Sequence, residues 1–193
     1  MTATLSALAW LILVVMFGSV VPVVPTGAAV SGAAALAAHQ HPLTVVLVVA
    51  AGALGAYVGD LVTYLVLGWG GERIARRLRW LREPERLDRV SARVREGRVS
   101  MLLVSRLIPG GRVPVLLAGA VAGLTWRRFA AANAPASLSW AALYAAIGVL
   151  GRAIFPEPWQ SVVAAILLVV LVTQGLSWVS RRRTAPAHPP ARP

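Results

Sequence analysis

The chain has 193 residues, of which 58% are hydrophobic and 13% are charged, and its net charge is +12. Soluble domains carry about 25% charged residues, so this composition argues against an ordinary water-soluble globule and favours a chain that lies mostly in lipid. The sequence has no cysteine, which excludes disulfides, iron–sulfur clusters and cysteine nucleophiles, and its three histidines and seven acids give little support for a metal site.

The N-terminal region predicts a membrane helix that meets a break. Residues 5–24 are apolar, and because no lysine or arginine precedes them we favour a retained helix over a cleaved signal peptide. Prolines within 22–27 interrupt a straight helix. The small residues 28–38 would reach only about 17 Å as a helix, which is too short for a bilayer core of about 30 Å. We therefore predict a re-entrant hairpin over about residues 18–40.

The next apolar run, residues 43–69, is long enough to cross the bilayer with some tilt. We expect the glycines within 68–71 to end this helix. The run contains one acid, Asp60, and a carboxyl group at membrane depth is either functional or ion-paired. We favour an ion pair with an arginine over a proton-relay role. Tyr64 lies one turn further along the same face, where it could hydrogen-bond Asp60 or could equally face lipid.

Residues 72–98 form the only strongly charged stretch, with ten arginines and five acids. Apolar residues at helical spacing predict two amphipathic helices, the second restarted at Pro84. Their place between membrane segments favours a helix pair lying on an anionic cytoplasmic leaflet, rather than nucleic-acid binding. In that arrangement Arg73, Arg76 and Arg77 would contact the membrane surface. The same pattern also fits a solvated connector without a specific ligand.

A second re-entrant hairpin is predicted over about residues 100–125. Its two apolar arms, of about 9 and 11 residues, are too short to cross, and Pro109 and Gly110 lie at the bend between them. Arg106 and Arg112 flank this bend. Guanidinium groups bind phosphate in a bidentate manner, so the pair predicts a site for an anionic head group, with Pro109 and Gly110 part of it. The alternative is a bend at the membrane interface whose arginines reach lipid phosphates.

Two further spans, at 129–150 and 159–179, complete the expected membrane domain over residues 1–180. The Pro-rich tail 181–193 is expected to be disordered. The arginine-rich segments should face the cytoplasm, which places the C-terminus there. The two hairpins would then enter from opposite sides, as in the inverted repeats of many secondary transporters.

Three segments of the chain share motifs with one family of membrane proteins. Residues 105–129 carry S-R-L-I-P-G-G-R, then A-G and F, which resembles the pattern R-x-x-P-G-x-R…A-G…F. Residues 59–71 resemble the segment G-D-x-x-x-Y-x-x-G, and residues 22–32 look like the element P-x-I-P-S-E. Over roughly residues 17–130 the chain thus resembles the DedA family, also called SNARE-associated or VTT-domain proteins.

The resemblance implies a multi-pass protein of the bacterial inner membrane. It implies a flippase of an anionic lipid, above all undecaprenyl phosphate (a polyprenyl phosphate), with Arg106 and Arg112 holding the phosphate. Three alternatives stay open: an energy-independent phospholipid scramblase, a non-transporting protein that organises the membrane through residues 72–98, and a transporter of small ions. We expect neither an enzyme nor a cofactor, because no Ser-His-Asp set, HExxH motif or catalytic carboxylate pair is present.

The chain departs from this family at its first hairpin. The family usually carries acids there, in the pattern E-N-x-x-P-x-x-P-S-E, and these acids are thought to serve proton coupling. Gly18 and Gly27 occupy the corresponding positions here. Either Asp60 takes over their role, or the coupling is lost, or the substrate differs.

Overall fold

A computed structural model gives the arrangement of the chain. It describes residues 2–21, 25–77, 102, 105–106, 112–121, 123–154, 160, 163, 167, 171 and 174–175. Within these residues the fold is all-α, as predicted, with five helices and no strand. They are α1 (Thr2–Val20), α2 (Thr26–Ala38), α3 (Pro42–Arg77), α6 (Arg112–Val121) and α7 (Trp126–Ile154).

Two of these helices are long and apolar enough to cross a membrane. They are α3 over Pro42–Gly70 and α7 over Trp126–Gly151, at the places of the predicted spans 43–69 and 129–150. The apolar parts of α1 and α2 are shorter. A separate α2 begins directly after Pro25, close to the predicted break. These elements fit a helical membrane protein.

One predicted helix boundary is wrong. The glycines within 68–71 do not end α3, which runs on to Arg77. A glycine inside a helix costs about 1 kcal/mol relative to alanine, but it keeps its N–H and so does not interrupt the hydrogen-bond ladder. Arg73, Arg76 and Arg77 therefore lie on the same helix as the membrane span, not on a separate amphipathic helix.

Several predictions fall on residues that the structure does not describe. Pro109 and Gly110 are among them, as are residues 78–98, most of the predicted span 159–179 and the tail 181–193. The surface role of Arg73, Arg76 and Arg77 also stays a prediction, because only the backbone of residues 71–77 is described.

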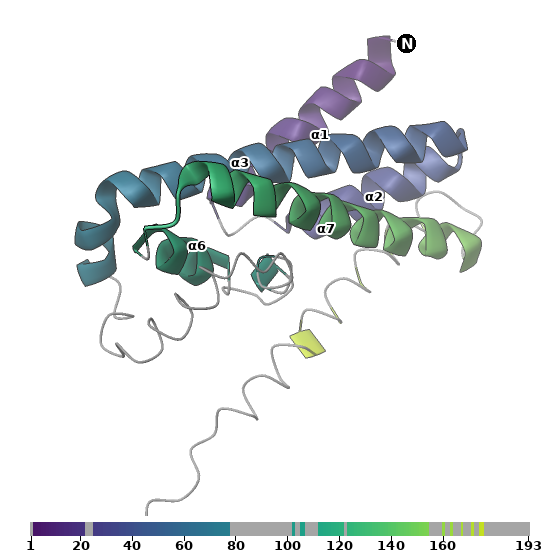
Figure 1. Ribbon diagram of the computed structural model, residues 1–193. Helices are drawn as coiled ribbons and strands as arrows, with labels where there is room; N and C mark the ends of the chain where they lie inside the picture. Colours follow the sequence, from purple (N-terminus) through teal and green to yellow (C-terminus); the bar gives the residue numbers. More distant parts are fainter. Residues whose placement is uncertain are drawn as a thin grey trace, which may run out of the picture.

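The helices pack around α3, which is the longest of them (Figure 1). α1 packs against α3, α2 and α7 pack against each other and against α3, and α6 packs against α3. The pairing of α2 with α7 is close. The Ser31 hydroxyl donates to the carbonyl oxygen of Tyr144 at 2.7 Å, and Gly148 leaves no room for a side chain between the two helices.

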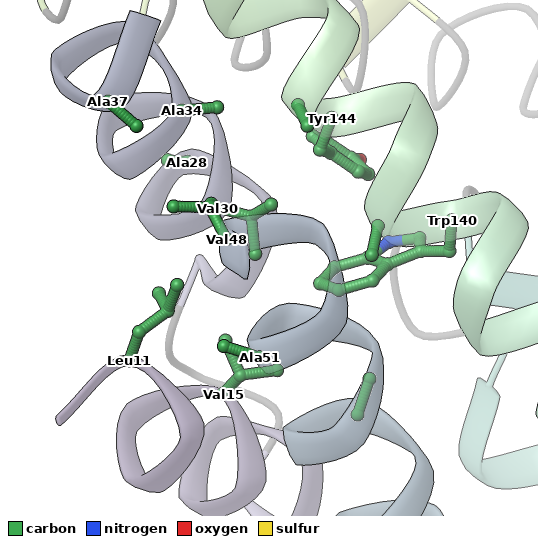
Figure 2. Close-up of a cluster of buried hydrophobic side chains, with 13 residues drawn as sticks. Leu11, Val15, Ala28, Val30, Ala34, Ala37, Val48, Ala51, Trp140 and Tyr144 are labelled. Carbon is green, nitrogen blue, oxygen red and sulfur yellow. The ribbon is translucent and has the colours of Figure 1, made fainter. Parts of the chain in front are cut away.

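Two apolar clusters divide the interior. The first joins four helices and includes Leu11 and Val15 of α1, Val30 and Ala34 of α2, Val48 and Ala51 of α3, and Trp140 and Tyr144 of α7 (Figure 2). The second joins three helices and includes Tyr64 and Leu67 of α3, Leu116 and Leu117 of α6, and Phe129 of α7. Along α3 the first cluster ends at Ala56 and the second begins at Tyr64. Asp60 lies between them.

Candidate functional site

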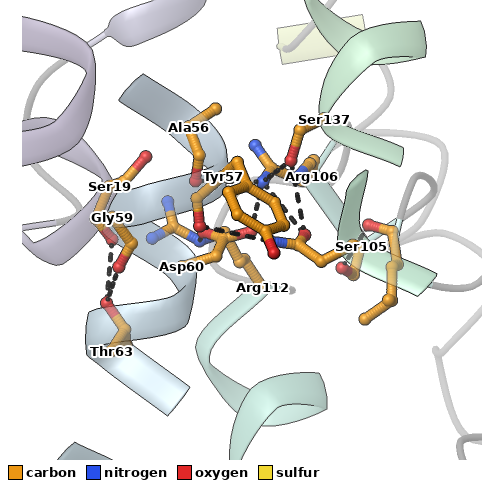
Figure 3. Close-up of polar contacts among 12 residues, drawn as sticks. Ser19, Ala56, Tyr57, Gly59, Asp60, Thr63, Ser105, Arg106, Arg112 and Ser137 are labelled. Atoms are coloured by element: carbon orange, nitrogen blue, oxygen red, sulfur yellow. Dashed lines mark hydrogen bonds and ion pairs between the residues drawn. The ribbon is translucent and has the colours of Figure 1, made fainter. Parts of the chain in front are cut away.

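The carboxylate of Asp60 joins the two arginines that flank the second predicted hairpin bend (Figure 3). Oδ2 accepts a hydrogen bond from Nη2 of Arg106, and Oδ1 lies 2.7 Å from Nε of Arg112. The side chains of Asp60 and Arg106 are buried, with exposed fractions of 2% and 4%, and that of Arg112 is half-buried at 17%. The geometry agrees with the ion-pair interpretation of Asp60.

Arg106 is fixed from two helices at once. Besides the bond to Asp60, its Nη2 lies 2.9 Å from Oγ of Ser137, 3.3 Å from Oδ1 of Asn133 and 3.4 Å from the carbonyl oxygen of Ala56. The guanidinium also lies over the ring of Trp140, with Cζ 5.5 Å from the ring centroid. This cation–π contact further stabilises the charge of Arg106. Arg106 is therefore held between α3 and α7.

The α7 side of this site was not predicted from the sequence. Asn133 and Ser137 are both buried and lie one helical turn apart, and the Ser137 hydroxyl donates to Oδ1 of Asn133 at 3.4 Å. The Asn133 amide also donates to the carbonyl oxygen of Tyr57 on α3 at 3.4 Å. The available signal was the i, i+4 spacing of two polar residues around Pro135 within an apolar span.

The site carries more positive than negative charge. It holds two guanidinium groups and one carboxylate, and Asp60 is the only acid whose side chain the structure describes. Nε of Arg106 and Nη2 of Arg112 are buried and have no hydrogen-bond partner among the described residues. The Nε–H of Arg112 is close to Asp60 but is not aligned with its oxygen. Buried unpaired donors and a buried net charge are both costly, so the arrangement is suited to one further anion.

Tyr64 does not take part in this cluster. Its hydroxyl donates to the carbonyl oxygen of Leu124, and its ring stacks on Phe129 with the centroids 4.1 Å apart. The ring is 4% exposed, so the lipid-facing alternative is wrong, and the hydroxyl bonds Leu124 rather than Asp60. Tyr64 ties the start of α7 to α3 beside the site.

An aromatic ring fills the space beside Gly27, one of the two glycines at which the family resemblance would place an acid. A Cβ atom at Gly27 would lie 2.4 Å from Cε1 of Tyr144. Tyr144 in turn contacts Trp140, with ring centroids 5.1 Å apart, and Trp140 covers Arg106. A side chain at position 27 thus requires Tyr144 to move.

Fold and site together define a helical membrane protein with a charged centre between apolar clusters. The family model of the VTT domain matches residues 9–150, which is well over half of the chain. The chain therefore belongs to the VTT-domain family, the DedA or SNARE-associated family, and the resemblance seen in its motifs is confirmed. Members are membrane proteins, generally of a transporter type rather than enzymes. Comparison with curated proteins and with solved structures gave no match.

Proposed function

We propose that this chain is a flippase that moves an anionic lipid across the membrane, and that the lipid is undecaprenyl phosphate or a similar polyprenyl phosphate. The observation that carries the proposal is the buried cluster of Arg106, Arg112 and Asp60, which has an excess of one positive charge and unpaired guanidinium donors. A phosphate supplies the missing negative charge and several acceptor oxygens. The polyprenyl tail would stay in the surrounding lipid.

The arrangement of the helices is compatible with such a path. The end of α1 reaches the level of the site, because the hydroxyl of Thr63, three residues from Asp60, lies 3.4 Å from the Ser19 carbonyl oxygen. α6 begins at Arg112 itself. Helices that end or begin near a binding site at mid-depth are typical of transporters, where one half rocks against the other. Two re-entrant hairpins of opposite entry, meeting at this cluster, are part of the proposal.

We also propose that the protein lies in the bacterial inner membrane with its C-terminus in the cytoplasm. Arg73, Arg76 and Arg77 would then meet the anionic cytoplasmic leaflet, where each basic residue contributes about 1 kcal/mol of attraction. A reporter fused after residue 193 tests the orientation, because a fluorescent cytoplasmic reporter is expected to be active there and a periplasmic enzyme reporter inactive.

The transport proposal is tested by reconstitution of the full chain in liposomes. Labelled polyprenyl phosphate and labelled phospholipids are supplied in parallel, with and without a pH gradient. We expect selective movement of the polyprenyl phosphate, abolished by Arg106→Ala and by Arg112→Ala. Arg128→Ala is the matched control, because Arg128 is exposed at the start of α7. An effect of the gradient would show that transport is coupled to protons.

Two results would contradict the polyprenyl phosphate proposal. Equal movement of all lipids, independent of the gradient, would make the protein a phospholipid scramblase. No movement of any lipid would exclude both transport functions and favour the membrane-organising alternative, in which Arg73, Arg76 and Arg77 matter more than the buried pair.

A further inference from the structure

The two arginines of the site have different surroundings. Nη2 of Arg106 has acceptors on α3 and α7, and its guanidinium lies over Trp140. For Arg112 the described residues provide one contact, that of Nε with Oδ1 of Asp60, and its Nη2 is buried and unpaired. Arg112 is also the more exposed of the two, at 17% against 4%. Within the described part of the chain, Arg106 is thus anchored by several acceptors, whereas Arg112 contacts a single carboxylate oxygen.

Asp60 divides its two oxygens between these arginines. Oδ2 bonds Arg106, and Oδ1 lies against Arg112 without a properly aligned hydrogen bond. Within the described residues this is the one contact that Arg112 makes, whereas Arg106 has three further acceptors. The contact with Arg112 can be given up while Asp60 remains neutralised by Arg106.

The charges in the site determine which ligand can replace the contact between Asp60 and Arg112. Among the described residues, one carboxylate serves two guanidinium groups and one positive charge is left over. If a singly charged anion binds Arg112, the site consists of two neutral pairs, Asp60 with Arg106 and the anion with Arg112. A doubly charged anion would leave one negative charge buried without a partner, which is costly in a site of low dielectric.

We infer that Asp60 is the resident anion of the site, and that a singly charged phosphate group takes its place on Arg112 while Arg106 retains it. Arg112 is then the residue that contacts the ligand, and Arg106 is a positioning residue that holds Asp60. A polyprenyl phosphate, which is a phosphomonoester, fits when it keeps one proton. A phosphodiester fits as it is, so the selection of polyprenyl phosphate over phospholipids comes from the rest of the lipid and not from the charge at Arg112. This inference rests on the proposed function and specifies how its site recognises the head group. Arg112 also begins α6, so first-turn N–H groups without a partner inside the helix lie beside it.

The test is a binding measurement on the full chain in detergent. Isothermal titration calorimetry at pH 8 compares the binding of dibutyl phosphate and octyl phosphate. Dibutyl phosphate carries one negative charge and octyl phosphate carries nearly two, and both have the same number of carbon atoms. Dimethyl phosphate, which has the same charge as dibutyl phosphate but no alkyl tails, is measured as well. The comparison separates recognition of a lipid from recognition of a free phosphate group. The variants are Arg112→Ala, Asp60→Asn and the double variant Asp60→Asn/Arg106→Gln, with Arg128→Ala as the control.

We expect dibutyl phosphate to bind more tightly than octyl phosphate. Arg112→Ala should weaken the binding of dibutyl phosphate by about tenfold or more, the effect of one charge-assisted hydrogen bond. Asp60→Asn removes the competitor and should tighten binding by a similar factor. The double variant removes a matched charge pair, so it is measured in place of Asp60→Asn if that single variant fails to fold. It should bind at least as tightly as the wild type.

The outcomes separate this inference from the function on which it rests. If the wild type binds neither probe, or if Arg112→Ala binds as well as the wild type, the phosphate site itself is wrong. If the wild type binds and Arg112→Ala does not, but the double variant binds more weakly than the wild type, only the exchange of Asp60 is overturned. Tighter binding of octyl phosphate also overturns it, because a doubly charged group would need both arginines.

Discussion

The close contact of α2 with α7 gives a prediction about stability that does not depend on any ligand. A Cβ atom at Gly148 would lie 2.1 Å from the carbonyl oxygen of Ser31 and 3.0 Å from the backbone nitrogen of Ala35. Both atoms belong to the backbone of α2, so neither can move away without shifting the helix. Gly148→Ala should therefore force α2 and α7 apart and strain the 2.7 Å hydrogen bond from Ser31 to Tyr144.

The expected size of this effect follows from a matched control. A Cβ atom at Gly68, in α3, would meet nothing within 4 Å. Both substitutions gain the same helix propensity, about 1 kcal/mol, so this gain cancels in the comparison. The remaining difference is the cost of overpacking, about 2 kcal/mol. For a chain of this size, that difference lowers the Tm of Gly148→Ala by about 4–8 °C relative to Gly68→Ala.

Thermal unfolding of the detergent-solubilised chain, followed by tryptophan fluorescence, measures this difference at one fixed heating rate. A Gly148→Ala protein that unfolds at the same temperature as Gly68→Ala, or above it, would refute the close approach of α2 and α7. Such a result would also weaken the placement of Tyr144 beside Gly27, because it depends on the same pair of helices.

Three further substitutions probe the charged centre and its support. Tyr64→Phe keeps the ring but removes the hydroxyl that donates to the carbonyl oxygen of Leu124. We expect the free energy of unfolding to fall by about 1–2 kcal/mol, measured by thermal or denaturant unfolding, and phosphate binding to stay unchanged. Ser137→Ala removes an acceptor 2.9 Å from Arg106 and should cost about 1–3 kcal/mol on the same scale, and a variant as stable as the wild type would exclude this contact. Asp60→Ala leaves the guanidinium groups of Arg106 and Arg112 without a counter-charge among the described residues, so it should lower the free energy of unfolding by about 3–5 kcal/mol. We expect poor expression and an early unfolding transition, and normal stability would contradict the ion pairs.

The membrane helices could be predicted from the sequence because length and apolarity are properties of a single segment. The spans at 43–69 and 129–150 follow from these properties alone. The end of α3 could not be predicted in the same way. Glycines within 68–71 weaken a helix without stopping it, and the neighbouring residues decide whether it continues.

The site was predictable in part for a similar reason. Asp60, Arg106 and Arg112 stand out because an ionisable group within an apolar stretch needs a partner or a function. Their partners on α7 gave a weaker signal, because Asn133 and Ser137 are neutral and cost less in a span than a charged group does. Only the packing of α7 on α3 reveals that both face Arg106.

The replaced hairpin acids bear on how charge is balanced in this protein. Asp60 is the only acid within residues 1–71, and the space beside Gly27 is filled by the ring of Tyr144. α1 and α2 therefore supply no carboxylate to Arg112. Among the described residues the cluster therefore has two arginines and one acid, and under the proposed function this excess positive charge favours the binding of an anion over a strict exchange of protons. An acid at position 27, combined with Tyr144→Ala to make room for it, should weaken the binding of dibutyl phosphate. Tyr144→Ala alone is the control.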